Sequence, residues 1–195
     1  MDDFADRVRI KEVKTLSDAH FTLRETAFDY RRRDGNWQTL SRETFDRGSA
    51  ACVLPIDPTR NTVLLVRQFR LAAYETGHRA PLIEAIAGGL DGDDAETCAR
   101  KEAREEAGVE LETVTQVMQC FMSPGAMTER MHLLVATYSA AGRTSAGGGL
   151  ADEGEDIEVL ELPFAEALAM VARGEIVDAK TILLLQHAKL AGLAE

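Results

Sequence analysis

The chain has 195 residues, of which 45% are hydrophobic and 28% are charged, a composition typical of a folded domain with a sizeable core. Its formal net charge of −11 argues against general affinity for nucleic acid or anionic membranes. The three cysteines stand far apart without a CxxC pair, and the four histidines have no ligand spacing, which argues against a disulfide framework or a zinc site. No apolar run has the length of a signal peptide or a membrane helix, so we expect a cytoplasmic protein that binds neither membrane nor nucleic acid.

The first fifty residues predict β structure, in which strands 21–30 and 37–45 flank a hairpin turn at Asp34-Gly35. The later elements are predicted mainly from the spacing of apolar residues. In chain order they are strands 50–56, 62–69 and 82–86, a helix ending at Gly108, strands 114–122, 131–138 and 156–162, and helices 163–173 and 181–193. Strands flanked by helices, with one helix in mid-chain, suit an α+β protein built as an αβα sandwich.

Two connecting segments have the composition of loops. Residues 123–129 contain the Pro and Gly of a turn. Residues 140–155 are rich in Gly, Ala and Ser and then become acidic, which is typical of a mobile lid. The acidic end of this lid offers Asp152, Glu153 and Glu155 as carboxylates that could close over a bound substrate.

The most informative stretch is 87–109, where a glycine-rich turn leads into a helix that carries Glu102, Glu105 and Glu106. Residues three and four apart share one face of a helix, so these carboxylates repel one another unless a cation lies between them. Hard divalent cations such as Mg²⁺ take oxygen ligands together with substrate phosphates. The pattern therefore predicts a metal-assisted reaction on a phosphorylated substrate, with a solvated helix face as the alternative. The inner face of the helix carries small residues: Cys98, Ala99, Ala103 and Ala107.

This stretch resembles the Nudix box, in which a glycine and an early glutamate precede Arg-Glu-apolar-x-Glu-Glu-x-Gly-apolar. Residues 101–109 match its second half, with Lys101 in place of the arginine. In the first half, Ala87 stands at the opening glycine, and either Asp93 or Asp94 fills the early acidic position. The resemblance implies a Nudix fold with a mixed central sheet, and hydrolysis of a nucleoside diphosphate compound with Mg²⁺, or Mn²⁺ in its place.

The resemblance also implies a metal site and a catalytic set. The metal ligands would be the backbone carbonyl of Ala87 and the carboxylates of Glu102, Glu106 and Glu155. Glu105 would contribute to catalysis or orient its neighbours. For the carboxylate supplied by the lid, Glu155 matches best, and Asp152 and Glu153 remain alternatives.

Cations that could bind phosphate are sparse. Arg67 and Arg70 end a strand, and one or both could enter the site, where the planar guanidinium binds two phosphate oxygens at once. By resemblance, the substrate-binding positions are His20, Ser41, Arg42, Glu43, Arg70, Ala87, Gly88, Gly89, Glu129 and Lys180.

Strings outside the box, including V-R-Q-F-R at 66–70 and E-D-I-E-V-L-E-L-P-F at 155–164, make the chain most similar to the GDP-mannose pyrophosphatase subgroup of the Nudix family. The resemblance implies hydrolysis of GDP-mannose to GMP and mannose 1-phosphate. It also implies a homodimer in which an N-terminal β region, residues 1–47, is exchanged beside a Nudix domain, residues 48–195. The alternatives are an ADP-ribose pyrophosphatase, which would give AMP and ribose 5-phosphate, and a silent Nudix module that only binds a nucleotide.

Overall fold

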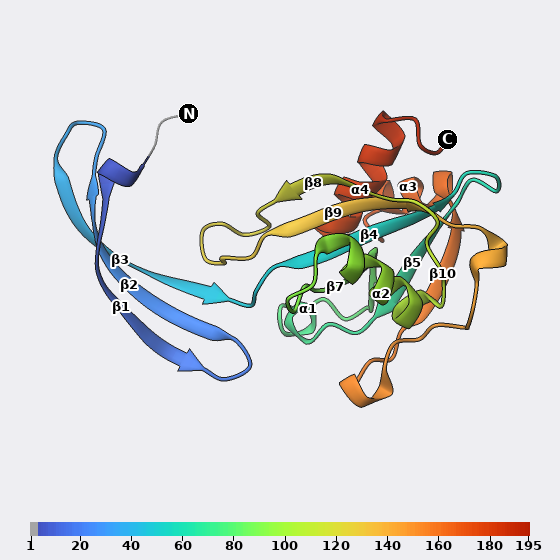
Figure 1. Cartoon of the computed structure of the whole chain (residues 1–195), viewed down its shortest axis with the longest axis horizontal. Coiled ribbons are helices and arrows are strands. Elements are labelled where there is room, and N and C mark those ends of the chain that lie inside the picture. The colour runs from blue at the N-terminus through green and yellow to red at the C-terminus, as the bar shows by residue number, and fades with distance from the viewer. Residues whose placement is uncertain (1–3) are drawn as a thin grey trace. The chain divides into compact units, whose positions relative to one another are not determined.

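The computed structural model describes residues 4–195 of the chain, apart from the side chain of Glu153. The chain divides into two compact units, labelled by element in Figure 1. The first unit contains the N-terminal residues up to Ser49 together with Phe121–Arg130, and the second contains Ala50–Cys120 and Met131–Glu195. No helix in the described part of the chain is long and apolar enough to cross a membrane.

The first unit is a three-stranded antiparallel sheet in the order β1-β2-β3. A short 3₁₀ helix at Ala5–Arg7 precedes β1 (Val8–Asp18), β2 (Thr22–Arg31) and β3 (Trp37–Asp46). The β2–β3 turn is the predicted one, with Gly35 at φ +88°. No side chain between residues 4 and 49 is buried, so this sheet has no hydrophobic core of its own.

The loop at 121–130 belongs to the first compact unit, although it lies between two strands of the second unit in the sequence. The reason is a pair of backbone hydrogen bonds that join it to the end of β3. Phe45 N donates to Ala126 O over 2.7 Å, and Thr128 N donates to Phe45 O over 3.1 Å. Long-range backbone pairing of this kind leaves no signal in the local sequence of the loop.

The second unit contains a seven-stranded sheet with the order β10-β5-β4-β9-β8, in which β6 also pairs with β5 and β7 with β4. Its strands are β4 (Ala50–Asp57), β5 (Thr62–Gln68), β6 (Leu82–Glu84), β7 (Ile86–Gly89), β8 (Val114–Cys120), β9 (Met131–Thr137) and β10 (Glu158–Pro163). The central strand β4 is buried throughout and runs parallel to β9, whereas the other pairs are antiparallel. The prediction of a mixed central sheet is confirmed.

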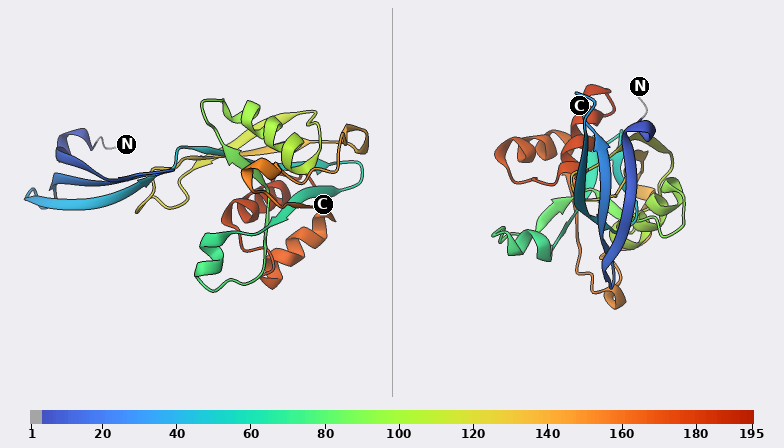
Figure 2. Two further views of the ribbon diagram at one scale, coloured as in Figure 1. Left: turned by 90° about the horizontal axis from the view of Figure 1, so that it is seen from below. Right: turned by 90° about the vertical axis from the view of Figure 1, so that its left-hand side faces the viewer.

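Helices cover both faces of this sheet, as Figure 2 shows with α2 on one side and α3 and α4 on the other. The helices are α1 (Leu71–Glu75), α2 (Ala95–Ala107), α3 (Phe164–Arg173) and α4 (Ala179–Leu190), with short 3₁₀ turns at Ala140–Gly142 and Ala151–Glu153. The small residues predicted for the inner face of α2 are buried against β4, β5 and β7. The αβα sandwich is therefore confirmed, while the short α1 was not predicted because five residues carry too little periodicity.

The first part of the predicted lid is packed against the C-terminal end of α2 and is not a free loop. Gly148 N donates to Glu106 O over 2.9 Å, and Gly149 N donates to Glu105 O over 3.1 Å. These carbonyls lie at the end of the helix, where they have no partner within it. Gly147, at φ +70°, lies so close that a Cβ there would come within 3.0 Å of Glu106 O and of the backbone of Ala107. The segment therefore caps α2 and needs glycine to do so.

We predict that Gly147→Ala lowers the free energy of unfolding more than Gly174→Ala does. Gly174 is the matched control, since it has φ +74° but open space around the position of a Cβ. Its substitution should cost about 1 kcal/mol for the left-handed backbone alone. Gly147→Ala should cost about 3 kcal/mol, because the methyl group also meets backbone that cannot move freely. Urea unfolding of both variants measures the difference, and equal losses would contradict the capping role of this segment.

Candidate functional site

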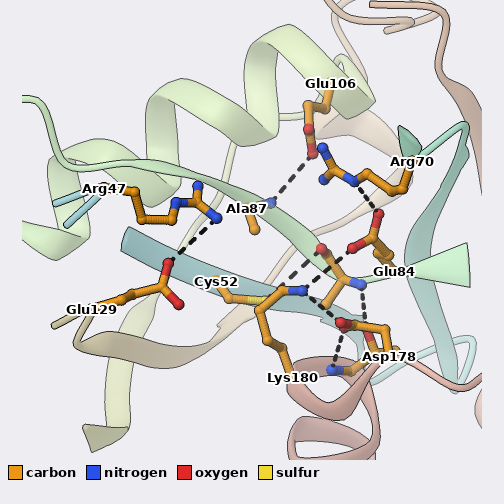
Figure 3. Close-up of polar contacts among 11 residues, drawn as sticks. Arg47, Cys52, Arg70, Glu84, Ala87, Glu106, Glu129, Asp178 and Lys180 are labelled. Atoms are coloured by element: carbon orange, nitrogen blue, oxygen red, sulfur yellow. Dashed lines mark hydrogen bonds and ion pairs between the residues drawn. The ribbon is translucent and has the colours of Figure 1, made fainter. Parts of the chain in front are cut away.

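Two glutamates of α2 approach the backbone of β7. Glu106 Oε2 accepts a hydrogen bond from Ala87 N at 3.3 Å, as Figure 3 shows. Glu102 lies against the next residue, because a Cβ on Gly88 would fall within 3.0 Å of Glu102 Oε1. The sequence suggested that Gly88 and Gly89 form a turn, and this was wrong: both lie in β7, paired with β4. At Gly88 the missing side chain makes room for a carboxylate.

Glu106 is the most perturbed acid of this cluster. Its side chain is buried, and burial together with the nearby charges of Glu102 and Glu155 raises its pKa to about 8. The hydrogen bond from Ala87 N and the charge of Arg70 oppose this shift of the pKa without cancelling it. A buried carboxylate that resists ionisation beside two other acids is a place where an added cation is stabilising.

The other two predicted acids make different contacts. Glu105 forms an i, i+4 ion pair with Lys101 at 3.9 Å. Glu155 Oε2 accepts a hydrogen bond from Leu150 N at 2.8 Å, which braces its own loop. Among the side chains that the structure describes, no group of three or more His, Cys, Asp or Glu is arranged so that it could hold a metal ion. Glu155 thus acts on Glu106 through its charge, and the side chain of Glu153 lies outside the described part.

Of the two candidates for the early acidic position, Asp94 has a structural role. Its Oδ1 accepts hydrogen bonds from the backbone N–H groups of Glu96 and Thr97, both at 3.0 Å, so it is the N-cap of α2. These bonds hold the pKa of Asp94 below its usual value. No hydrogen bond of the Asp93 side chain is found in the described part of the chain. Asp94 therefore fixes where the acid-bearing helix begins.

A second polar cluster gathers around the buried Glu84, the last residue of β6 (Figure 3). Arg70 Nε donates to Glu84 Oε2 over 2.8 Å, and Lys180 Nζ donates to Glu84 Oε1 over 3.3 Å. Lys180 also pairs with Asp178 at 2.6 Å, and Asp178 accepts a bond from Thr181 N as the N-cap of α4. The predicted cations Arg70 and Lys180 are thus brought together by acids that the sequence analysis did not assign.

The charge of Lys180 is maintained despite its burial. Desolvation alone would lower the pKa of its ammonium group, but the carboxylates of Asp178 and Glu84 outweigh this and raise the pKa above 10.5. The cluster is tied to the sheet because Thr181 Oγ1 accepts a hydrogen bond from Ala85 N at 2.6 Å. Lys180 is therefore a fixed cation at the start of α4, rather than a mobile surface lysine.

Arg70 lines an open pocket of about 580 Å³ together with Arg67, Phe69 and residues 154–156. The two arginines differ in their partners. Arg67 binds Glu158 through both Nε and Nη2 across the β5–β10 pair. Arg70 uses only Nε within the described residues, so its two terminal nitrogens remain available to a ligand. Of the two arginines that the sequence left open, Arg70 is the better placed to bind phosphate.

The remaining candidates lie in the first unit. Ser41 Oγ donates to Glu25 at 2.9 Å, Arg42 is exposed on the same strand with Glu43, and His20 contacts the ring of Phe21. Glu129 is buried, 3.4 Å from Arg47 Nη1. Its Oε1 makes no hydrogen bond to the described residues. A buried acid with an unused acceptor is a candidate for binding a ligand.

Sequence reasoning missed Glu84, Asp178 and Arg47. Glu84 had a usable signal, because it is a lone acid within the apolar run Leu82–Ile86, and buried acids are almost always paired. Asp178 precedes Thr181 by three residues, the spacing of a helix N-cap. For Arg47 the local sequence carries no signal, because its partner lies 82 residues further on.

Comparison with known proteins identifies both parts of the chain. Residues 7–45 match the family described as the GDP-mannose pyrophosphatase NudK N-terminal domain, and residues 46–186 match the NUDIX domain. A GDP-mannose pyrophosphatase of Klebsiella pneumoniae is 48% identical over 187 residues, covering 95% of this chain and 93% of the relative. One from Escherichia coli O1:K1 is 45% identical over 190 residues, covering 97% and 98%.

A solved structure supports the same fold. The crystal structure of an ADP compounds hydrolase superposes with a TM-score of 0.72 over 95% of this chain and 96% of the other, at 19% identity. At that identity the likeness concerns the fold alone. Taken with the matches to both domain families, it leads to one conclusion: the chain belongs to the Nudix hydrolase family.

Proposed function

We propose that this protein is a cytoplasmic pyrophosphatase that hydrolyses GDP-mannose to GMP and mannose 1-phosphate. The observation that carries the proposal is the match of the whole chain to enzymes named GDP-mannose pyrophosphatase, at 45% and 48% identity in the two relatives described above. The N-terminal match to the NudK domain supports the same subgroup, since it lies outside the Nudix domain. In the cytoplasm the three cysteines would remain thiols, the state in which the structure has them.

Nudix hydrolases generally need a divalent metal ion, and we propose Mg²⁺, with Mn²⁺ able to replace it. The carbonyl of Ala87 and the carboxylates of Glu102, Glu106 and Glu155 would hold it. This donor set consists of oxygen atoms only, which suits a hard cation. The raised pKa of Glu106 also fits, because a cation relieves the repulsion among these acids. When bound, the metal would neutralise charge on the diphosphate and activate water.

The other charged residues of the second unit would bind the substrate. Arg70 offers two terminal nitrogens in the pocket, and Lys180 offers a fixed ammonium group. A guanidinium can hold two phosphate oxygens in one plane, whereas an ammonium group acts as a point charge. We therefore assign Arg70 the orienting role and Lys180 a role in neutralising charge.

We also propose a homodimer in which the first unit of each subunit serves the site of the other. The first unit has no buried side chain between residues 4 and 49, and a small sheet without a core is marginally stable by itself. β1 exposes apolar side chains that include Ile10 at 59% and Val13 at 55%. A second copy would cover such a surface, and His20, Ser41, Arg42 and Glu43 would reach the partner's substrate.

The substrate proposal predicts the outcome of an assay panel. With Mg²⁺ present, kcat/KM for GDP-mannose should exceed that for ADP-ribose, ADP-glucose and UDP-glucose by about tenfold or more, the discrimination that a few base contacts provide. The products should be GMP and mannose 1-phosphate, identified by chromatography. A clear preference for ADP-ribose would show that the substrate assignment is wrong, whereas the proposed hydrolysis of a diphosphate would stand. Absence of turnover with all four compounds would favour the silent module.

The metal proposal predicts opposite effects of Glu106→Gln on activity and stability. Metal-dependent turnover should be lost. The pKa of Glu106 is about 8 in the folded state and 4.5 in the unfolded chain. The folded protein therefore loses stability as the pH rises from 4.5 through 8, because ionising the buried acid costs free energy. Without metal at pH 8.5, Glu106→Gln should therefore have the higher free energy of unfolding, a gain that shrinks toward pH 5.

Urea unfolding in the presence of a chelator measures this difference in stability. Glu105→Gln is the matched control, because Glu105 lies on the same helix but pairs with Lys101 on its surface, so its substitution should give no such gain. Full metal-dependent activity of Glu106→Gln would contradict the metal assignment.

The dimer proposal predicts subunit complementation. Arg42→Ala and Glu106→Gln subunits should each be inactive or weakly active, but co-expression should form mixed dimers with one intact site. With random pairing, about one quarter of all sites would be restored. Co-expression of Glu102→Gln with Glu106→Gln is the control and should restore nothing, because both changes lie in the same unit. Failure of the first pair, with dimers confirmed by light scattering, would show that each site uses one chain only.

A further inference from the structure

Glu84 is a buried acid whose two oxygens are held by cations from two different parts of the second unit. Its side chain is 4% exposed. Oε2 accepts from Arg70, which lies just before α1, and Oε1 accepts from Lys180 at the start of α4. Both acceptor atoms are thus used by residues that the proposed function places on the substrate.

The contact with Arg70 leaves the useful edge of the guanidinium open. Glu84 engages Nε, at the side of the group, and the two terminal nitrogens make no hydrogen bond to the described residues. The Arg70 side chain is 43% exposed and lines the open pocket. Its charge also reaches Glu106. Glu84 therefore fixes the orientation of the guanidinium without occupying the nitrogens that bind a phosphate.

The contact with Lys180 works in the same way. An ammonium group has three donors, and Lys180 gives one to Glu84 and one to Asp178. The third is left for a ligand. Formal charges in the cluster balance, with Arg70 and Lys180 positive and Glu84 and Asp178 negative. Without Glu84, Lys180 would keep Asp178 as its partner, whereas Arg70 would lose the acid that holds its Nε.

We propose that Glu84 is a positioning residue, which holds Arg70 and Lys180 as a pair aligned on the diphosphate of the substrate. It acts through these two cations and does not itself touch the substrate. This inference rests on the proposed function, because it assigns the two cations to phosphate binding. It adds that turnover depends on the positions of Arg70 and Lys180 as well as on their charge.

The test is a set of double-mutant cycles with the nucleotide sugar that the wild type turns over best. Glu84→Gln removes the charge, and Glu84→Asp keeps the charge but is too short to reach both cations. Each should lower kcat by about 10- to 100-fold, the effect of misplacing a group that positions the substrate. In an Arg70→Ala, Lys180→Ala background, the same changes should lower kcat by about twofold or less, because residues that act through one another are not additive.

Asp57→Asn is the matched control. Asp57 is also a buried acid paired with an arginine, Arg60, but it lies at the other end of β4, five residues beyond Cys52, which pairs with Ala87. The Asp57→Asn variant should have a lower free energy of unfolding in urea and an unchanged kcat. If Glu84→Gln does not fold, Glu84→Asp carries the test, since the buried charge is kept.

Two results would overturn the inference. One is an unchanged kcat in folded Glu84 variants, and the other is an equal loss of kcat in the presence and absence of the two cations. Failure of the proposed function is distinguishable, because the wild type would then turn over no nucleoside diphosphate sugar.

Discussion

The close approach of α2 to β7 is the constraint on which the site depends. Small residues on the inner face of the helix let it lie against the sheet, and Gly88 removes the last side chain in the way of Glu102. The result is a group of acids held against backbone, with Glu106 so desolvated that its pKa rises to about 8. Packing thus brings these acids close enough to repel one another, and a bound divalent cation would reduce the repulsion.

The strand segment from Glu84 to Gly89 connects this acidic face to the cations. Ala87 and Gly88 meet the acids of α2, whereas Glu84 and Ala85 meet Lys180 and Thr181 of α4. The helices on the two faces of the sheet therefore contact one short segment of chain, α2 through its glutamates and α4 through Lys180 and Thr181. A sandwich with helices on both faces is needed for this arrangement, and for that reason the fold and the chemistry of the site belong together.

The parts of this arrangement that follow from local spacing could be predicted from the sequence. The acid-bearing helix, its glycine end and its small inner face all depend on residues within about four positions of each other, and they were predicted correctly. What depends on tertiary contact was misread or missed. The glycines of β7 looked like a turn, although Gly88 serves an approach by a residue fourteen positions away. Likewise the glycine-rich start of the lid looked mobile, although its N–H groups cap the end of α2.

Glu84 shows why charged residues in apolar runs repay closer attention. An acid buried at 4% exposure costs free energy unless it is paired, so its presence in a strand predicts cations that arrive from elsewhere in the chain. Here Arg70 lies 14 positions before it and Lys180 lies 96 after it, and the resemblance had already implied that both are substrate-binding residues. A buried acid of this kind indicates which candidate cations are fixed in position to bind a ligand. Only cations whose nitrogens reach the oxygens of the acid are held in place. Arg67 pairs instead with the exposed Glu158, so Glu84 does not hold it beside Lys180.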